Sequence, residues 1–259
     1  MRLDIALVQR GLCSSRARAK TAIEAGLVAV NGNRAYKPSV IISESDALVL
    51  QDDDSLRYVS RGALKLLRAL DYFQLDVTGL TCLDVGASTG GFTQVLLERG
   101  ASRVTAVDVG TAQLAQALRE DPRVASLEQT DIRTLSIPPM DFCCVDVSFI
   151  SLKLVLPSMF ALLRQGACAI CLVKPQFEVG PARVGKHGLV KDQKAQAFAI
   201  AEVIAAAQQA GFAPQGLTYS PVLGGVGNVE FLLHLTKSGS TAPLPDIAEI
   251  VNQAGEALT

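Results

Sequence analysis

The sequence lacks any run of 18 uninterrupted apolar residues, the length that a membrane-spanning helix requires. It also lacks a signal peptide at its start, because the apolar part of residues 1–10 is short and is soon interrupted by charge. We therefore expect no membrane span and a cytoplasmic protein.

Cysteines arranged for metal binding are missing too. The six cysteines are scattered, and most lie inside apolar runs, as is typical of buried free thiols in a reducing compartment. Cys168 and Cys171 form a C-x-x-C pair within the strand-like run Ala167–Val173, where their side chains would point to opposite faces of a sheet. We expect neither a metal site nor a redox function.

A strong net charge is also absent, since the formal charge is −1, but the charge is unevenly distributed. Residues 1–50 carry seven Lys and Arg against four Asp and Glu, a net +3, so the remainder carries −4. A basic N-terminal segment attached to an acidic remainder predicts that the N-terminal segment binds a polyanion.

The centre of the chain contains a glycine-rich turn between two predicted elements. Thr81–Val85 is an apolar, β-favouring run, Gly86, Gly90 and Gly91 interrupt it, and Phe92–Arg99 has helical spacing. Strand, turn and helix in this order make the nucleotide-binding corner of a doubly wound α/β sheet. The spacing matches neither the dinucleotide fingerprint nor the phosphate loop of NTPases. The turn suits a ligand with a ribose and an adenine but no pyrophosphate, and S-adenosylmethionine is the ligand we expect. An ordinary strand–helix turn is the alternative.

Acidic residues at later strand ends support the same ligand. Asp108 follows the predicted strand Arg103–Val107 and could bind both hydroxyls of a ribose, while Asp131 could reach an adenine amino group. A helix is expected over Thr111–Leu118. The predicted cofactor-binding residues are Asp84, Gly86, Ala87, Ser88, Thr89, Gly90, Gly91, Phe92, Asp108, Asp131, Ile132 and Asp146.

Charged residues also stand where further elements meet the carboxyl edge of the predicted sheet. Ser60 is a candidate N-cap for a helix over residues 61–70, with Leu64, Leu67 and Leu70 on its buried side. The spacing of Arg61, Lys65 and Arg68 puts them on one face of that helix. This face is either exposed to solvent or presented to a phosphate backbone.

The first 50 residues predict two helices followed by a hairpin with an Asn31-Gly32 turn. The segment from Leu12 to Gly32 resembles the S4-type RNA-binding domain of a ribosomal protein and of several rRNA-modifying enzymes. The resemblance implies an RNA-binding surface, and a solvated basic helix face is the alternative. The predicted RNA-binding residues, with two from the helix that follows, are Arg16, Arg18, Lys20, Arg34, Lys37, Arg61 and Arg68.

Four residues together resemble the Lys-Asp-Lys-Glu tetrad of FtsJ-type ribose 2′-O-methyltransferases: Lys65, Asp146, Lys174 and Glu230. Their contexts match as well, in residues 60–66, 145–148, 172–178 and 227–231. The chain to about residue 237 resembles the TlyA family, with Ala63 as one departure where the family usually has glycine. The resemblance implies methylation of a cytidine ribose in ribosomal RNA within ribosomal subunits, with S-adenosyl-L-methionine as cofactor and the tetrad as catalytic residues. We expect Lys174 to assist removal of the hydroxyl proton.

The expected fold is α/β, a Rossmann-like class I methyltransferase sheet with helices on both faces, preceded by a small α+β RNA-binding domain. We expect residues 1–55 to form the RNA-binding domain, 56–62 a linker, 63–240 the methyltransferase domain and 241–259 a helical tail. Two alternatives remain open from the sequence. One is a membrane-active haemolysin, for which only the last helix is a candidate, and the other is a non-catalytic RNA-binding protein of the same fold.

Overall fold

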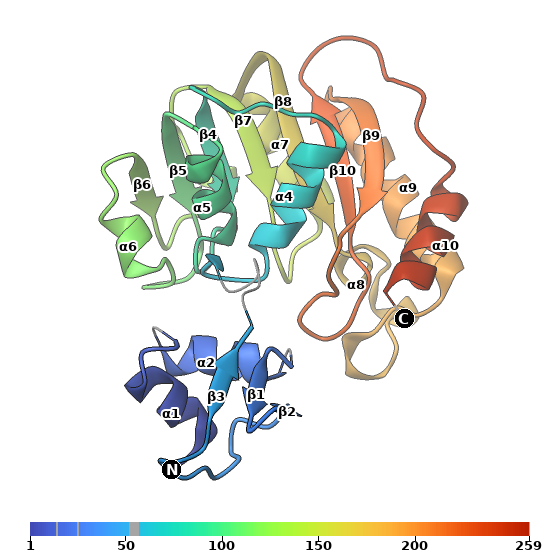
Figure 1. The fold of residues 1–259 in the computed structure, drawn as a ribbon. Helices are drawn as coiled ribbons and strands as arrows, with labels where there is room; N and C mark the ends of the chain where they lie inside the picture. The colour runs from blue at the N-terminus through green and yellow to red at the C-terminus, as the bar shows by residue number, and fades with distance from the viewer. Residues whose placement is uncertain (14, 25, 52–56, 259) are drawn as a thin grey trace. The chain divides into compact units, whose positions relative to one another are not determined.

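The computed structural model describes residues 1–259 except 14, 25, 52–56 and 259 (Figure 1). The chain divides into two compact units, Met1–Tyr58 and Val59–Thr259. The division falls inside the linker expected over residues 56–62, although residues 52–56 lie outside the described part of the chain. The two units are described separately below.

The N-terminal unit packs two helices against a small antiparallel sheet of order β2-β1-β3. Asn31 and Gly32 both have positive φ, 51° and 81°, which is the geometry that a tight hairpin turn between β1 and β2 requires. The core contains Leu3, Leu7 and Ile23, all with 0% exposure. The elements are α1 (Leu3–Gln9), α2 (Arg16–Glu24), β1 (Val28–Val30), β2 (Asn33–Ala35) and β3 (Leu48–Leu50).

The C-terminal unit is built on a seven-stranded sheet of order β6-β5-β4-β7-β8-β10-β9. The first five strands in this order are parallel, and β10 is antiparallel to both neighbours. The strands are β4 (Thr81–Val85), β5 (Arg103–Val107), β6 (Val124–Leu127), β7 (Met140–Val145), β8 (Leu163–Val173), β9 (Ala213–Tyr219) and β10 (Phe231–Thr236). The chain leaves β4 toward β5 and returns on the other side with β7, so the sheet reverses its winding at β4, where ligands bind in such folds.

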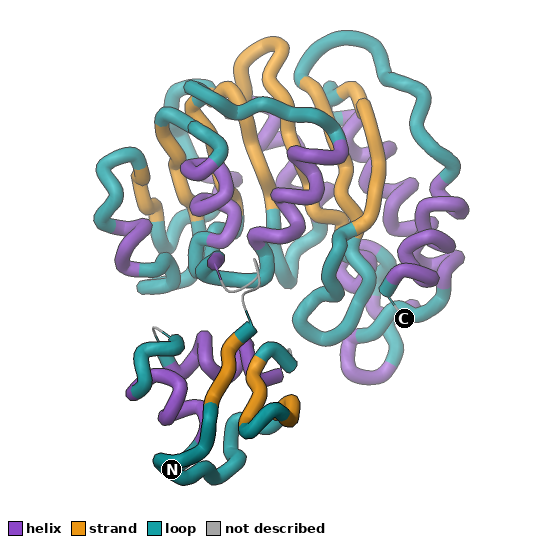
Figure 2. Tube along the Cα trace, viewed as in Figure 1, coloured by secondary structure: helices purple, strands orange, loops and turns teal. Residues whose placement is uncertain are grey.

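Helices cover both faces of this sheet (Figures 1 and 2). α4 and α5 lie on one face, while α7 and α9 lie on the other, with α10 against α9. The main core fills the space between the sheet and α7 and α9. The helices are α4 (Ala63–Tyr72), α5 (Gly91–Glu98), α6 (Gln116–Arg119), α7 (Leu152–Ala161), α8 (Pro175–Glu178), α9 (Gln193–Gln209) and α10 (Ile247–Ala257), with 3-10 turns η1 (Ile132–Thr134), η2 (Pro181–Arg183) and η3 (Lys186–Gly188).

Several local predictions were wrong. Ser60 does not cap α4, which begins at Ala63 with Gly62 at the N-cap position and no side-chain cap hydrogen bond. The helix expected over Thr111–Leu118 forms only over Gln116–Arg119, because Ala112 has φ +51° and the Glu128 carboxylate binds the amides of Ala112 and Gln113, at 2.6 and 3.1 Å. The buried side of α4 carries Leu66 and Leu70 rather than Leu64 and Leu67, which are half-buried.

Candidate active site

The turn after β4 is fixed between its two neighbouring strands. The amide of Gly86 donates to the carbonyl of Val107 at 2.8 Å, and that of Asp146 to Val85 at 2.9 Å. Gly86 has φ +80°, and a Cβ there would lie 2.4 Å from the carbonyl oxygen of Asp146. Only glycine fits this position, because any side chain would collide with the backbone that leads out of β7.

A cavity of about 390 Å³ lies at the carboxyl ends of β4, β5 and β7. Half of the predicted cofactor-binding residues line it: Gly86, Ser88, Asp108, Asp131, Ile132 and Asp146. The others do not appear in its wall: Asp84, Ala87, Thr89, Gly90, Gly91 and Phe92. Lining residues that the sequence did not single out include Val109, Gly110, Gln113, Thr130, Val147, Ser148 and Phe149. These residues lie in loops after strand ends, and no sequence pattern indicates the path of those loops.

Asp108 is the acid best placed for a ribose diol. Its two carboxylate oxygens accept backbone N–H groups from Ser88, at 2.8 Å, and Gly110, at 2.7 Å. These bonds fix the carboxylate at the cavity wall and leave each oxygen able to accept one more hydrogen bond. The residue therefore ties the glycine-rich turn to the loop after β5 while keeping free acceptor capacity for a hydroxyl.

Asp131 lines the cavity beside η1, and its carboxylate is held by the Arg133 guanidinium, with Nε 3.0 Å from each oxygen. These hydrogen bonds lower the pKa of Asp131, so the group is a charged acceptor at neutral pH. An acceptor at this position suits the amino group of an adenine.

Asp84 lies beneath the turn instead of in the cavity. Its side chain is fully buried, and its Oδ2 accepts a hydrogen bond from Thr93 Oγ1 at 2.6 Å. Burial raises the pKa of Asp84 to about 7, and the nearby charge of Asp146 adds to that shift. Strand alternation explains the position, since Asp84 points toward α5.

Gly90 and Gly91 serve packing rather than the cavity. Gly90 has φ +97° and precedes α5, and a Cβ on Gly91 would lie 2.3 Å from Ser60 Oγ and 3.0 Å from the amide of Ala63. The missing side chain thus lets the start of α5 approach the segment that leads into α4. Lys65 is in the first turn of α4, so this contact helps to place it.

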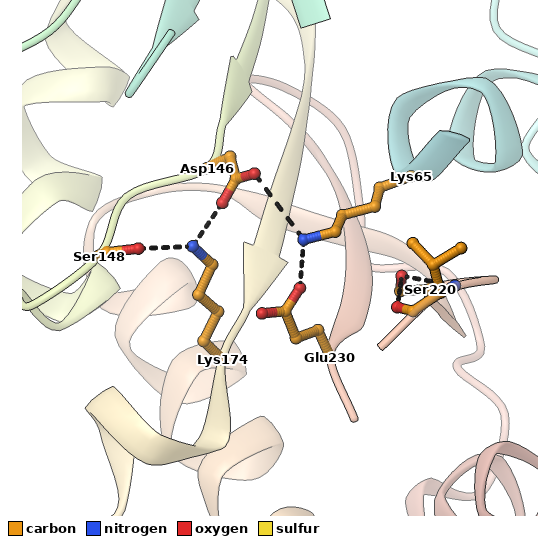
Figure 3. A network of polar contacts seen from close by, with 7 residues as sticks. Lys65, Asp146, Ser148, Lys174, Ser220 and Glu230 are labelled. Carbon is orange, nitrogen blue, oxygen red and sulfur yellow. Dashed lines mark hydrogen bonds and ion pairs between the residues drawn. The ribbon is translucent and has the colours of Figure 1, made fainter. Parts of the chain in front are cut away.

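The four tetrad residues meet in one cluster (Figure 3). Lys174 Nζ lies 2.5 Å from Asp146 Oδ1, and Lys65 Nζ lies 2.5 Å from Glu230 Oε2 and 4.0 Å from Asp146 Oδ2. They come from α4, the ends of β7 and β8, and the residue before β10. Because β10 is antiparallel, its start lies beside the end of β8, which brings Glu230 to the same edge as the other three.

The cluster alternates cations and anions and is largely removed from solvent. Side-chain exposure is 9% for Lys174, 20% for Asp146, 10% for Lys65 and 3% for Glu230. The formal charge of the four is zero, which is the condition under which buried ionic groups are tolerated. A Cβ on Gly224 would lie 2.4 Å from Glu230 Oε1, so glycine is required beside this carboxylate.

Two neighbours of the tetrad were not predicted. Ser148 Oγ accepts a hydrogen bond from Lys174 Nζ at 2.9 Å (Figure 3). Phe149 is 91% exposed with φ +64°, a strained conformation for an aromatic residue, and its ring centroid lies 5.3 Å from that of Phe177. It borders both the cavity described above and a second one of about 520 Å³. Ser148 belongs to the family-like segment 145–148, but no local pattern in the sequence assigns a role to it or to Phe149.

The predicted RNA-binding residues lie on both units. Arg16, Lys20, Arg34, Lys37 and Arg61 are exposed, and Arg18 is half-buried. Arg68 is half-buried, with its guanidinium 4.9 Å from the centroid of the Tyr72 ring. Lys65 does not share an exposed face with Arg61 and Arg68, because its side chain turns into the tetrad.

Within the described ranges, no helix is both long and apolar enough to cross a membrane. Groups of three or more His, Cys, Asp or Glu side chains placed to hold a metal ion are likewise not found in the described part of the chain.

Fold and site together define a methyltransferase, and comparison with known proteins supports this class. The FtsJ-like methyltransferase family model matches residues 58–237, and the S4 domain model matches residues 1–48. Solved structures of S-adenosylmethionine-dependent methyltransferases share the fold, such as one from Listeria monocytogenes with TM-score 0.53 and 16% identity over 70% of this chain and 100% of that one.

Comparison with individual relatives assigns the chain to a particular family of methyltransferases. The 16S/23S rRNA (cytidine-2′-O)-methyltransferase TlyA of Mycobacterium tuberculosis is 46% identical over 90% of this chain and 89% of its own. Hemolysin A of Brachyspira hyodysenteriae is 36% identical over 90% and 99%. A solved structure from Streptococcus thermophilus, described as a hemolysin, has TM-score 0.79 and 43% identity over 99% of this chain and 96% of that one. The chain belongs to the TlyA family of FtsJ-like methyltransferases.

Proposed function

We propose that the chain transfers a methyl group from S-adenosylmethionine to the ribose 2′-hydroxyl of a cytidine in ribosomal RNA. The observation that carries the proposal is the position of Asp146, which lines the cavity and also pairs with both lysines of the tetrad. The carboxylate of Asp146 thus belongs both to a cavity of nucleoside size and to a buried cluster that could bind the hydroxyl group of a substrate. The cytidine and the ribosomal RNA follow from the names of the relatives.

The residues around the cavity fit S-adenosylmethionine. Asp108 offers two acceptors for the ribose hydroxyls, Asp131 offers an acceptor for the adenine amino group, and the adjoining Ile132 offers an apolar wall. Gly86 lines the cavity without a side chain, because a Cβ there would collide with the carbonyl of Asp146. When bound, this cofactor supplies a methyl group on a sulfonium, an activated electrophile.

The tetrad then has to orient the 2′-hydroxyl and help to remove its proton. Lys174 already donates to an alcohol oxygen, that of Ser148, so its amine is placed to bind a ribose hydroxyl in the same way. An ammonium is not a base, so Lys174 must lose a proton before it can accept one from the ribose. Asp146 and Glu230 hold the two lysines in register, and alignment of oxygen, carbon and sulfur contributes most of the rate.

The target nucleotide has an aromatic surface available beside this cluster. Phe149 is exposed at the rim of the cavity, and Phe177 supports it from α8. Unpaired bases in RNA stack on such rings, and the stacking would hold the nucleotide with its ribose toward Lys174. The strained backbone at Phe149 is consistent with a functional position.

The first prediction tests the proposed reaction through Lys174. We expect Lys174→Ala to abolish transfer of labelled methyl groups to ribosomal subunits from cells that lack the enzyme, and to leave cofactor affinity nearly unchanged. The reason is that Lys174 does not line the cofactor cavity. Rates are measured with small and large subunits separately, and cofactor affinity by calorimetry.

Lys153→Ala is the matched control, since this lysine pairs with Glu202 outside the tetrad and should retain activity. Loss of cofactor binding in Lys174→Ala would count against the assigned role. Failure of the unaltered protein to methylate either subunit would overturn the proposed function and favour a non-catalytic RNA-binding protein.

A further inference from the structure

A buried acid underlies the basic surface of the N-terminal unit. Asp4, in the first turn of α1, is 4% exposed, and residues 1–50 around it carry a net charge of +3. Its Oδ1 accepts from Arg2 Nε at 3.0 Å, and its Oδ2 accepts from Arg2 at 3.3 Å and from Arg16 at 3.0 Å. One carboxylate therefore holds two guanidinium groups.

The two arginines keep most of their donor capacity outside this contact. Arg2 and Arg16 side chains remain 46% and 62% exposed, whereas that of Asp4 is 6% exposed. A guanidinium has five N–H donors in a fixed fork, so binding Asp4 leaves several free on each arginine. These three residues line an open hollow of about 450 Å³ together with Pro38, Ser39, and Lys20 and Glu24, which pair with each other at 3.7 Å.

Asp4 is charged at neutral pH. The hydrogen bond from Arg2 is the main reason that its pKa is lowered to about 2, and Arg16 adds to the shift. The backbone around Asp4 is fixed independently, since its amide donates to the Pro38 carbonyl and that of Leu3 to Val40. The carboxylate is therefore not needed to place the start of α1.

We propose that Asp4 is a positioning residue for RNA binding, which holds Arg2 and Arg16 side by side so that their free N–H groups bind adjacent phosphates of the RNA backbone. The inference rests on the proposed RNA substrate. It concerns the N-terminal unit alone and requires no contact between Asp4 and RNA.

For one substitution, the change in net charge and the loss of arginine positioning predict opposite changes in RNA affinity. Asp4→Asn makes the surface more positive by one unit, so charge alone predicts tighter binding and a steeper salt dependence. Positioning predicts weaker binding, because asparagine is uncharged and carries an NH2 donor in place of one of the two oxygens that accept from the arginines. We expect the dissociation constant for ribosomal subunits to rise about tenfold, and the slope of log affinity against log salt to fall by about one, the contribution of one phosphate contact.

The experiment measures binding of the full chain to purified ribosomal subunits from cells lacking the enzyme, by co-sedimentation at several salt concentrations. Glu44→Gln is the matched control, because it adds the same charge at an exposed position of the same unit. Asp4→Glu is the second variant, since it keeps the charge and displaces the carboxylate by one methylene. We expect weaker binding for Asp4→Glu and unchanged or tighter binding for Glu44→Gln.

A double-substitution cycle separates positioning from a loss of folding. In a chain that already carries Arg2→Gln and Arg16→Gln, Asp4→Asn should weaken binding no further. Unchanged or tighter RNA binding by both Asp4→Asn and Asp4→Glu would overturn the inference. If Arg2→Gln and Arg16→Gln together leave RNA affinity unchanged, these two arginines do not bind RNA and the inference is overturned. The Lys174 experiment measures methyl transfer, so its result tests the proposed function independently.

Discussion

At the scale of single residues, the two lysines of the site have different surroundings. Lys65 lies between two carboxylates, whereas Lys174 has one carboxylate and one hydroxyl as partners. Lys65 therefore links the carboxylates of Asp146 and Glu230 electrostatically. Lys174 already binds a hydroxyl group, as it would have to bind the hydroxyl of a substrate. The difference comes from the loop after β7, which delivers Ser148 to Lys174 and not to Lys65.

A second prediction concerns the buried carboxyl of Asp84. Its pKa is about 7 in the folded protein against an ordinary value of 3.8, so the folded state keeps a proton that the unfolded state loses as pH rises from about 4 to 7. Its contribution to stability is present below pH 4 and is lost across this window. Asp84→Asn does not titrate, so its free energy of unfolding relative to the unaltered protein should increase between pH 4 and 8 by on the order of 3 kcal/mol.

Urea unfolding of both proteins at a series of pH values checks this. A difference in unfolding free energy that stays constant from pH 4 to 8 would show that Asp84 is ionised in the folded protein.

At the scale of elements, the loop before α9 supports the segment that leads into β10. Asn228, 2% exposed, accepts from the Val190 amide and donates to the Gly188 carbonyl, both at 2.8 Å. Gln196 on α9 donates to the Val190 carbonyl at 2.8 Å. The segment before α9 that contains Gly188 and Val190 is thus joined to the segment that carries Glu230. A similar link occurs at α8, where Glu178 accepts from Ser151 Oγ at 2.5 Å and from the Leu152 amide at 2.8 Å.

The third prediction follows from the Asn228 contacts. We expect Asn228→Ala to slow methyl transfer about tenfold, because the buried Val190 amide and the partly buried Gly188 carbonyl lose their partner and the strand start at Glu230 loosens. Cofactor affinity should not change, since the cavity is formed by other strand ends. Steady-state kinetics with calorimetry measure both quantities.

Gln215→Ala serves as the control, because this amide also bonds to two backbone carbonyls but lies on β9. Equal losses of activity in the two variants would indicate a general effect on stability.

The sequence predicted the elements better than their details. The bounds expected for β4 and β5 agree with the structure, because short apolar runs between breakers leave few alternatives. The helix expected over residues 111–118 was wrong because its competitor, the Glu128 carboxylate, comes from a later strand end. The meeting of Lys65 with Glu230 was predicted through resemblance to a family, whereas Ser148 and Phe149 depend on a loop course that no local pattern specifies.

At the scale of the whole molecule, the N-terminal unit and the C-terminal unit have separate cores and separate chemistry. Leu3, Leu7 and Ile23 fill the first, and the main cluster behind the seven-stranded sheet fills the second. Phosphate contacts position an RNA without carrying out chemistry on it. We therefore expect substitutions on the first unit to change how often RNA is bound rather than how fast bound RNA reacts.

The fourth prediction tests this separation. Arg34→Gln together with Lys37→Gln, both exposed near the hairpin, should raise KM for ribosomal subunits by about tenfold and leave kcat at saturation unchanged. Cofactor affinity should also stay the same. A fall in kcat at saturating RNA, with KM unchanged, would contradict a purely binding role.

The order of the strands has a consequence for synthesis on the ribosome. β10 is the last strand to be made, yet it must enter between β8 and β9, and β9 pairs with no other strand in the described sheet. Until it does, β8 presents an open edge and β9 has no neighbour to hold it. Lys65 also waits for Glu230, which is 165 residues further along the chain. A growing chain therefore gains its active cluster only in a late step, and that interval is when it is most exposed to misfolding.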